Sequence, residues 1–298
     1  MTISLIKADE GEPAGAPDPQ PGPPGASGPP SPTPGVWAGR LAELGRGLGW
    51  AVLGTTAVLL LWQLAASRST DVPAPIDGAR TLVDLLADPF YDNGPNDKGV
   101  GRQLGTSLQR VFIGFALAAV VGVSAGMLIG ASRRAWLAFN PVVQVLRPVS
   151  PLAWFPIWLA VLKDAAQASI FVIFITALWP TLINTAAGAA DIPKDHRNVA
   201  RVFRFGRLAY TRHVLVPNAL PSIITGLRLS MGIAWMVIVA VEMLSGTSGI
   251  GFFVWDSYNA GNLSSVVAAI VLIGLVGLVL DVILVRLSRK VAIEEVQS

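Results

Sequence analysis

Six apolar segments, each about 20 residues long, set the main constraint on how this chain can fold. A helix that crosses a bilayer needs roughly 20 mostly apolar residues, so each segment is long enough to span the hydrocarbon layer. Only 14% of the residues are charged, whereas a soluble domain carries about 25%. We therefore predict an all-α integral membrane protein with about six transmembrane helices, over Leu48–Ala66, Leu108–Ala131, Asn140–Leu162, Ala168–Ala190, Ala219–Ser245 and Ser264–Leu287.

The third of these segments is interrupted by four prolines, namely Pro141, Pro148, Pro151 and Pro156. Proline frees backbone groups, and at membrane depth these must be satisfied by neighbouring protein or by water in a cavity. We therefore expect this segment to pack against other helices or to line a passage.

The two ends of the chain differ from the apolar middle. Residues 1–35 hold ten prolines and six glycines, and such a stretch cannot bury enough surface to offset its ordering entropy. We predict a disordered cytoplasmic tail over 1–35, a transmembrane domain over 36–290 and a cytoplasmic C-terminal tail over 291–298.

The basic residues predict the orientation. If there are six spans, four basic groups fall on one side, and the loop Gly246–Leu263 on the other side has no Lys or Arg. By the positive-inside rule, both termini are then cytoplasmic. The four groups are Arg40 and Arg46; Arg133 and Arg134; Lys194, Arg197, Arg201, Arg204, Arg207 and Arg212; and Arg286, Arg289 and Lys290.

Small residues recur at every fourth position of the second span, at Gly114, Ala118, Gly122, Gly126 and Gly130. This pattern lets helix backbones approach closely in lipid. Two interpretations remain open: packing inside one chain, or packing across a dimer.

The cytoplasmic loop over residues 191–218 has the pattern of a short amphipathic helical pair. Pro193 and Asp195 suit the start of a helix, Gly206 suits its end, and a second helix is expected over Leu208–Leu215 before Pro217. Arginines three and four residues apart share one face, while Val199 and Phe203 share another. The pair either binds anionic lipid headgroups or inserts Val199 and Phe203 into a groove on a cytoplasmic partner.

Charged residues inside the membrane are costly and therefore mark candidate functional positions. Arg228, Trp235 and Glu242 lie nearly on one face of the fifth span, because seven and fourteen residues correspond to about two and four helical turns. Arg228 either pairs with Asp281 or serves a pathway, and Glu242 either pairs locally or helps close an outer gate. Arg147 either attracts an anion in transit or extends toward the cytoplasm.

Several motifs resemble those of a known family. The run Asn198-Val199-Ala200, followed by Arg204 and Val214–Pro221, resembles the coupling loop of binding-protein-dependent ABC importer permeases, although Asn198 stands where many members have Glu and Arg204 where many have Gly. The segments Asn140–Trp154, Ile173–Thr185 and Thr225–Gly251 are similar to the nitrate, bicarbonate and cyanate branch of the taurine-type permeases.

The resemblance implies a type I ABC importer permease fold and a chain that is not an enzyme. It implies two cytoplasmic ATPases that use ATP and Mg, an extracytoplasmic solute-binding protein and the bacterial inner membrane. It also implies a second permease, which is either a second copy of this chain in a homodimer or a related permease. The implied coupling residues are Asn198, Val199, Ala200, Arg201, Phe203, Arg204, Gly206 and Pro217, and the predicted pathway residues are Arg147, Ser150, Trp154, Arg228, Trp235 and Glu242.

The residue types agree with this division of labour. A phosphate-binding loop needs a Gly-Lys pair, and this sequence has none, so ATP must bind to another chain. With no cysteine and only two histidines, we expect no cofactor or metal on this chain, and we expect lipid but no nucleic acid as a further partner.

The predicted function is import of a small anion, nitrate first, with bicarbonate, cyanate, taurine or alkanesulfonate as alternatives. Rivals of another class are an ion-gradient-driven secondary transporter and a membrane scaffold that transports nothing.

Overall fold

The computed structural model describes residues 35–69, 72–94 and 97–297. The chain divides into two units, Met1–Val58 and Leu59–Ser298. Helix α1 (Gly35–Ser67) begins in the first unit. The tail predicted over 1–35 lies outside the described residues, apart from Gly35, which begins this helix.

The described residues are almost entirely helical, as predicted. The second unit contains α2 (Pro75–Ala87), α3 (Val100–Gly130), α4 (Arg133–Leu146), α5 (Pro151–Leu162), α6 (Ala165–Ala190), α7 (Lys194–Val202), α8 (Arg207–Tyr210), the π-helical turn η1 (Thr211–Leu215), α9 (Val216–Ser245), α10 (Ile250–Asn259) and α11 (Leu263–Gln297). Among the described residues, five stretches are long and apolar enough to cross a membrane, namely Gly45–Ser67, Val100–Gly130, Ala165–Ala190, Leu208–Ser245 and Leu263–Ser288.

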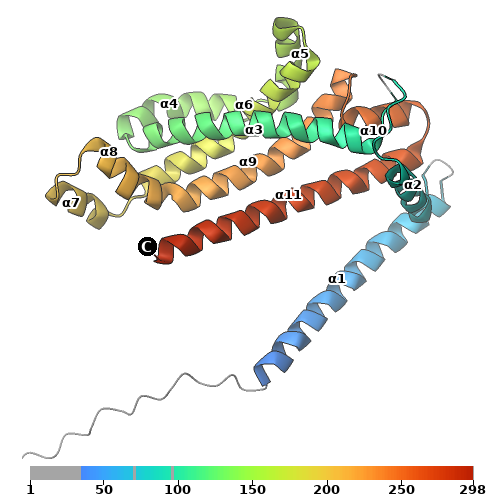
Figure 1. The fold of residues 1–298 in the computed structure, drawn as a ribbon, viewed down its shortest axis with the longest axis horizontal. Coiled ribbons are helices and arrows are strands. Elements are labelled where there is room, and N and C mark those ends of the chain that lie inside the picture. The colour runs from blue at the N-terminus through green and yellow to red at the C-terminus, as the bar shows by residue number, and fades with distance from the viewer. Residues whose placement is uncertain (1–34, 70–71, 95–96, 298) are drawn as a thin grey trace, which may run out of the picture. The chain divides into compact units, whose positions relative to one another are not determined.

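The proline-rich third segment is broken, and its two halves, α4 and α5, meet at 92° (Figure 1). The break falls between Leu146 and Pro151. If the bent pair is one crossing, the total is six, so the fold class expected from the sequence is confirmed.

Helices α3 and α6 run in parallel, with the small-residue stripe of α3 between them. Gly114 lies against Ile173, and Gly126 lies against Thr185, so residue numbers rise together along the contact. A Cβ added at Gly126 would lie 2.7 Å from the carbonyl oxygen of Leu182, closer than real Cβ contacts allow. The stripe thus serves packing inside one chain, which confirms the first of the two interpretations. Because both helices point the same way, the bent pair between them must return the chain across the bundle.

Helix α9 packs antiparallel to α6, and α11 packs antiparallel to α9 (Figure 1). The hydroxyl of Ser230 in α9 lies 2.7 Å from that of Thr181 in α6. The indole nitrogen of Trp235 donates a 3.0 Å hydrogen bond to the carbonyl oxygen of Ile273 in α11. These contacts surround the main apolar core.

The segment between α6 and α9 forms the predicted helical pair, but its first helix ends earlier than expected. Helix α7 ends at Val202 rather than at Gly206, because Arg204 adopts a left-handed conformation with φ of 48°. The amide of Phe205 then donates to the carbonyl of Ala200, a bond typical of the Schellman motif. The expected second helix is present as α8 and η1, which continue into α9.

Two helices were not predicted. The loop Gly246–Leu263 contains α10, and α2 precedes α3. At the other end, α11 continues to Gln297, through most of the segment predicted as a C-terminal tail.

Candidate functional site

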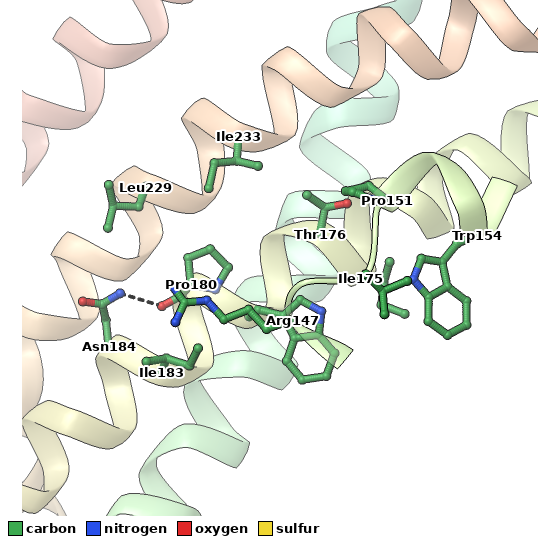
Figure 2. A pocket seen from close by; sticks show the side chains of 12 residues that line it. Arg147, Pro151, Trp154, Ile175, Thr176, Pro180, Ile183, Asn184, Leu229 and Ile233 are labelled. Carbon is green, nitrogen blue, oxygen red and sulfur yellow. Dashed lines mark hydrogen bonds between the residues drawn. The ribbon is translucent and has the colours of Figure 1, made fainter. Parts of the chain in front are cut away.

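A cavity of about 280 Å³ lies where α5, α6 and α9 meet the α4–α5 break (Figure 2). Its walls are mainly apolar and aromatic, and its polar groups are few. The lining residues are Arg147, Val149, Pro151, Trp154, Ile175, Thr176, Trp179, Pro180, Ile183, Asn184, Leu229 and Ile233.

Arg147 supplies the charge of this cavity. Its side chain extends from the break toward the Pro180 turn of α6 (Figure 2). No carboxylate of the described residues lies within ion-pair distance of its guanidinium group. The guanidinium therefore keeps its five N–H donors available to an anion.

Two other polar side chains of the cavity form hydrogen bonds inside α6. The hydroxyl of Thr176 donates to the carbonyl oxygen of Val172 at 2.6 Å. The side-chain amide of Asn184 donates to the carbonyl oxygen of Pro180 at 2.8 Å (Figure 2). Asn184 thereby adds a side-chain hydrogen bond to the Pro180 turn of α6.

The six residues of the predicted pathway lie in four places. Arg147 and Trp154 line the cavity, and Ser150, which precedes α5, is exposed beside it without lining it. Trp235 is buried against α11, as described above. Arg228 and Glu242 lie in two separate ion pairs.

Arg228 forms a two-pronged ion pair with Asp281 of α11, with N–O distances of 2.8 and 3.0 Å. The pairing with Asp281 is the first of the two alternatives that we gave for Arg228 from the sequence. About half of each side chain is exposed on this chain. Because the guanidinium is already engaged, Arg228 is less available to a solute than Arg147.

Glu242 is completely buried at the far end of α9 and pairs with Arg110 of α3 at 2.9 Å. The hydroxyl of Ser107 donates to the same carboxylate at 2.7 Å, and the amide of Gly251 donates to it at 3.2 Å. Glu242 therefore pairs locally, which is the first of the two alternatives that we gave for it from the sequence.

Arg110 was not identified from the sequence as a candidate functional residue, although it lies in the predicted second span. The signal was available, because Arg110 stands four residues before Gly114 and extends the small-residue stripe by one turn. It donates to the carbonyl oxygen of Ser248 at 2.7 Å and to its hydroxyl at 2.8 Å. Gln103 and Ser107 accept from the amides of Gly249 and Ile250. One face of α3 thereby fixes the start of α10.

Gly249 lies directly against the Glu242 carboxylate and has φ of 112°. A side chain at this position would require both a strained backbone and displacement of the carboxylate. The glycine allows the loop to close tightly over the buried ion pair.

A second candidate surface lies on the α7–α8 segment. Val202, Phe203 and Leu208 are 77%, 70% and 83% exposed, which is unusual for large apolar side chains so close together. Ala200 is buried in a small core with Leu215 and Ala219, so the segment is anchored on its inner side.

The other predicted coupling residues fall into three groups. Asn198, Arg204 and Gly206 are exposed, and Pro217 lies in the first turn of α9. The side chains of Val199 and Arg201 lie outside the described residues.

Comparison with known proteins agrees with these features. Residues 107–293 match the family described as "Binding-protein-dependent transport system inner membrane component". The nitrate import permease protein NrtB of Synechocystis sp. is 48% identical over 225 residues, which cover 75% of this chain and 82% of that protein. The bicarbonate transport system permease protein CmpB of Synechococcus elongatus is 45% identical over 241 residues, which cover 79% and 86%.

The fold is also found among solved structures. An inward-facing structure of the MetNI methionine ABC transporter superposes with a TM-score of 0.57 at 18% identity, over 64% of this chain and 94% of that chain. The chain therefore belongs to the binding-protein-dependent ABC importer permeases: it is a membrane subunit, not itself an enzyme, and this membership implies an ATPase that hydrolyses ATP and a binding protein as its partners.

Proposed function

We propose that this chain is the permease subunit of a nitrate importer of the bacterial inner membrane, with both termini in the cytoplasm. The observation that carries the proposal is that Arg147, which has no ion-pair partner among the described residues, lines a small aromatic cavity. The relatives of the nitrate and bicarbonate branch support a small inorganic anion.

Arg147 suits a planar oxyanion because its guanidinium is planar and donates two parallel hydrogen bonds to a planar acceptor. A single cation binds the anion weakly enough to release it, as conduction requires.

Nitrate is favoured over bicarbonate by a small margin. Nitrate permeases are 47% and 48% identical to this chain, whereas the bicarbonate permeases are 45% identical. Bicarbonate differs from nitrate in carrying an O–H donor. The choice therefore needs a direct comparison of the two anions.

The exposed apolar group Val202, Phe203 and Leu208 supports the assignment of residues 191–218 as the coupling loop. Such side chains on a short helical pair fit a groove on a partner. In the proposed orientation the group faces the cytoplasm, where nucleotide-driven movement of the ATPase would bias the helix bundle between two packings.

A second copy of the chain completes the proposed transporter. Leu229 lines the cavity and is half exposed, so one wall of the cavity offers apolar surface for a partner to cover. A homodimer would place two such cavities beside a shared axis.

The test is reconstitution of the transporter with its ATPase and binding protein, followed by ATP hydrolysis and uptake with nitrate, bicarbonate, cyanate or taurine. We expect nitrate to stimulate hydrolysis most. Arg147→Gln should raise the nitrate concentration for half-maximal uptake by about tenfold or more, as expected for loss of a charged hydrogen bond. Lys163→Gln, an exposed cation at the other end of α5, is the control.

Three results would contradict the proposal. Stronger stimulation by bicarbonate would exclude nitrate as the main substrate, and normal nitrate uptake in Arg147→Gln would exclude the pathway assignment. Uptake that follows a proton or sodium gradient without ATP would instead favour a secondary transporter.

The coupling surface is tested separately. Phe203→Asp combined with Leu208→Asp should abolish co-purification of the ATPase, because two carboxylates would enter the apolar contact. Val83→Asp, at an exposed apolar position of α2, should leave co-purification intact.

A further inference from the structure

A larger cavity, of about 890 Å³, lies at the opposite end of α6 from its first turn. Its lining comes from the end of α3, the start of α4, the last turns of α6 and the η1 region. We call it the basic-end cavity, and its lining residues are Gly130, Ala131, Arg133, Trp136, Leu137, Ile183, Ala186, Ala187, Ala189, Ala190, Ile192, Tyr210 and Leu215. Apart from Ile183, it shares no lining residue with the Arg147 cavity.

The basic-end cavity lies at the boundary between hydrocarbon and water. Two of its lining residues, Gly130 and Ala190, are the last residues of candidate membrane spans, and a third span begins at Leu208, two residues before Tyr210. Parallel α3 and α6 therefore end at the same level, and the cavity opens between their ends.

The walls and the rim of this cavity differ in chemistry. The apolar lining comprises Ile183 and four alanines of α6, with Leu137 and Leu215. The polar lining residues, which we call the rim, are Arg133, Trp136 and Tyr210, and these residue types anchor proteins at the headgroup level. No carboxylate is among the lining residues.

The polar rim groups have no protein partner within the part of the chain that the structure describes. Neither the Arg133 guanidinium, the Trp136 indole nitrogen nor the Tyr210 hydroxyl makes an ion pair or a side-chain hydrogen bond there. Arg134 lies next to Arg133 and is exposed, so the local charge is positive. An apolar wall under a positive, donor-rich rim is complementary to an anionic amphiphile.

We propose that the basic-end cavity binds one anionic phospholipid. Its phosphate accepts hydrogen bonds from Arg133, its glycerol region lies beside Trp136 and Tyr210, and an acyl chain covers the alanines of α6. Pockets that are basic at the rim and lie between helices at the membrane surface bind such headgroups. The lipid would then contact Leu215 and Ile192, which flank the α7–α8 segment.

The experiment uses the purified full-length chain, equilibrated with equal amounts of dioleoylphosphatidylglycerol and dioleoylphosphatidylcholine. Retained lipid is counted by native mass spectrometry. We expect one phosphatidylglycerol per chain, preferred over phosphatidylcholine by about fivefold, the contribution of roughly one basic side chain near a membrane surface.

Two variants separate the site from general attraction to basic residues. Arg133→Gln should remove the preference, whereas Arg134→Gln, the adjacent cation that does not line the cavity, should keep it. Ala187→Trp should expel the lipid by filling the cavity while Arg133 is unchanged. Ala187 is exposed, so this variant should fold, and its unfolding temperature verifies that it does.

Three outcomes would overturn the proposal. Equal retention of the two lipids would show that the rim does not select charge, and equal effects of the two arginine variants would show that the attraction is not specific to this cavity. Loss of the lipid when the ATPase and the second permease copy are added would show that a protein partner occupies the cavity instead.

Discussion

The buried Arg110–Glu242 pair gives the sharpest prediction for stability. Glu242→Gln keeps the size of the side chain but removes the charge opposite a guanidinium that is 7% exposed. The new amide also has one acceptor oxygen for three donors, which are Ser107, Arg110 and the amide of Gly251. Breaking a buried ion pair by removing one partner costs about 3–5 kcal/mol.

The expected loss of unfolding free energy can be converted into a decrease in the Tm. In a domain of 150–250 residues, 1 kcal/mol shifts the Tm by about 2–4 °C, so Glu242→Gln should lower the apparent Tm by about 10 °C. The measurement is thermal unfolding of the purified chain in detergent, followed by size-exclusion chromatography of the protein that remains folded. Asp92→Asn is the control, because it breaks a partly exposed pair with Arg102, also on α3, at 3.2 Å. Such a pair contributes about 0–1 kcal/mol.

A double-mutant comparison separates the ion pair from simple loss of packing. Arg110→Gln combined with Glu242→Gln should cost at least 2 kcal/mol less than the sum of the two single changes, because each single change leaves the other charge unpaired. The reasoning is refuted if the free-energy losses of the two single variants add in the double variant. It is also refuted if the Tm of Glu242→Gln lies within 2 °C of that of the Asp92→Asn control, because such a difference corresponds to about 1 kcal/mol or less.

Three further predictions concern backbone positions. Gly249→Ala should destabilise the chain by more than about 2 kcal/mol, because backbone strain and the clash with the buried Glu242 carboxylate add. The control is Gly246→Ala, which should cost only about 1 kcal/mol, because Gly246 has φ of 65° and no atom within 4 Å of an added Cβ. Thermal unfolding compares the two variants. Arg204→Gly should stabilise the turn after α7 by about 1 kcal/mol, because glycine adopts φ of 48° without strain. The readout is slower amide hydrogen exchange at the end of α7, and unchanged exchange would contradict the prediction. Gly126→Ala should push α3 away from α6 at a cost of about 1–3 kcal/mol, whereas Gly105→Ala on the same helix, with no atom within 4 Å, should be harmless in the same unfolding assay.

The sequence predicted the crossing helices well because membrane spans are set by length and apolarity alone. The prolines marked the third span as interrupted, but four prolines spread over 16 residues did not locate the break between Leu146 and Pro151. The sequence placed the start of α3 at Leu108 instead of Val100, since Arg102 and Gln103 made the first turns of α3 look too polar for a span. Both residues form hydrogen bonds with residues outside α3, which no local pattern reveals.

The candidate site was predicted only in part for the same reason. Arg147 and Trp154 are close in sequence and flank one break, so their shared cavity could be anticipated. Helical periodicity placed Arg228 and Glu242 on one face of α9, but their environments are set by α11 and α3, respectively. Periodicity describes one helix, whereas a site depends on which helices lie beside it.

The buried ion pair also limits how early this part of the fold can form during synthesis. Arg110 and Glu242 are separated by 132 residues, so the arginine leaves the ribosome well before its partner exists. At 5–20 residues per second, that interval is on the order of 10 s. The nascent chain must hold this cation near the membrane surface for the whole interval, where its long side chain can reach water. The N-terminal half of α3 is thus completed only when α9 arrives, late in biosynthesis.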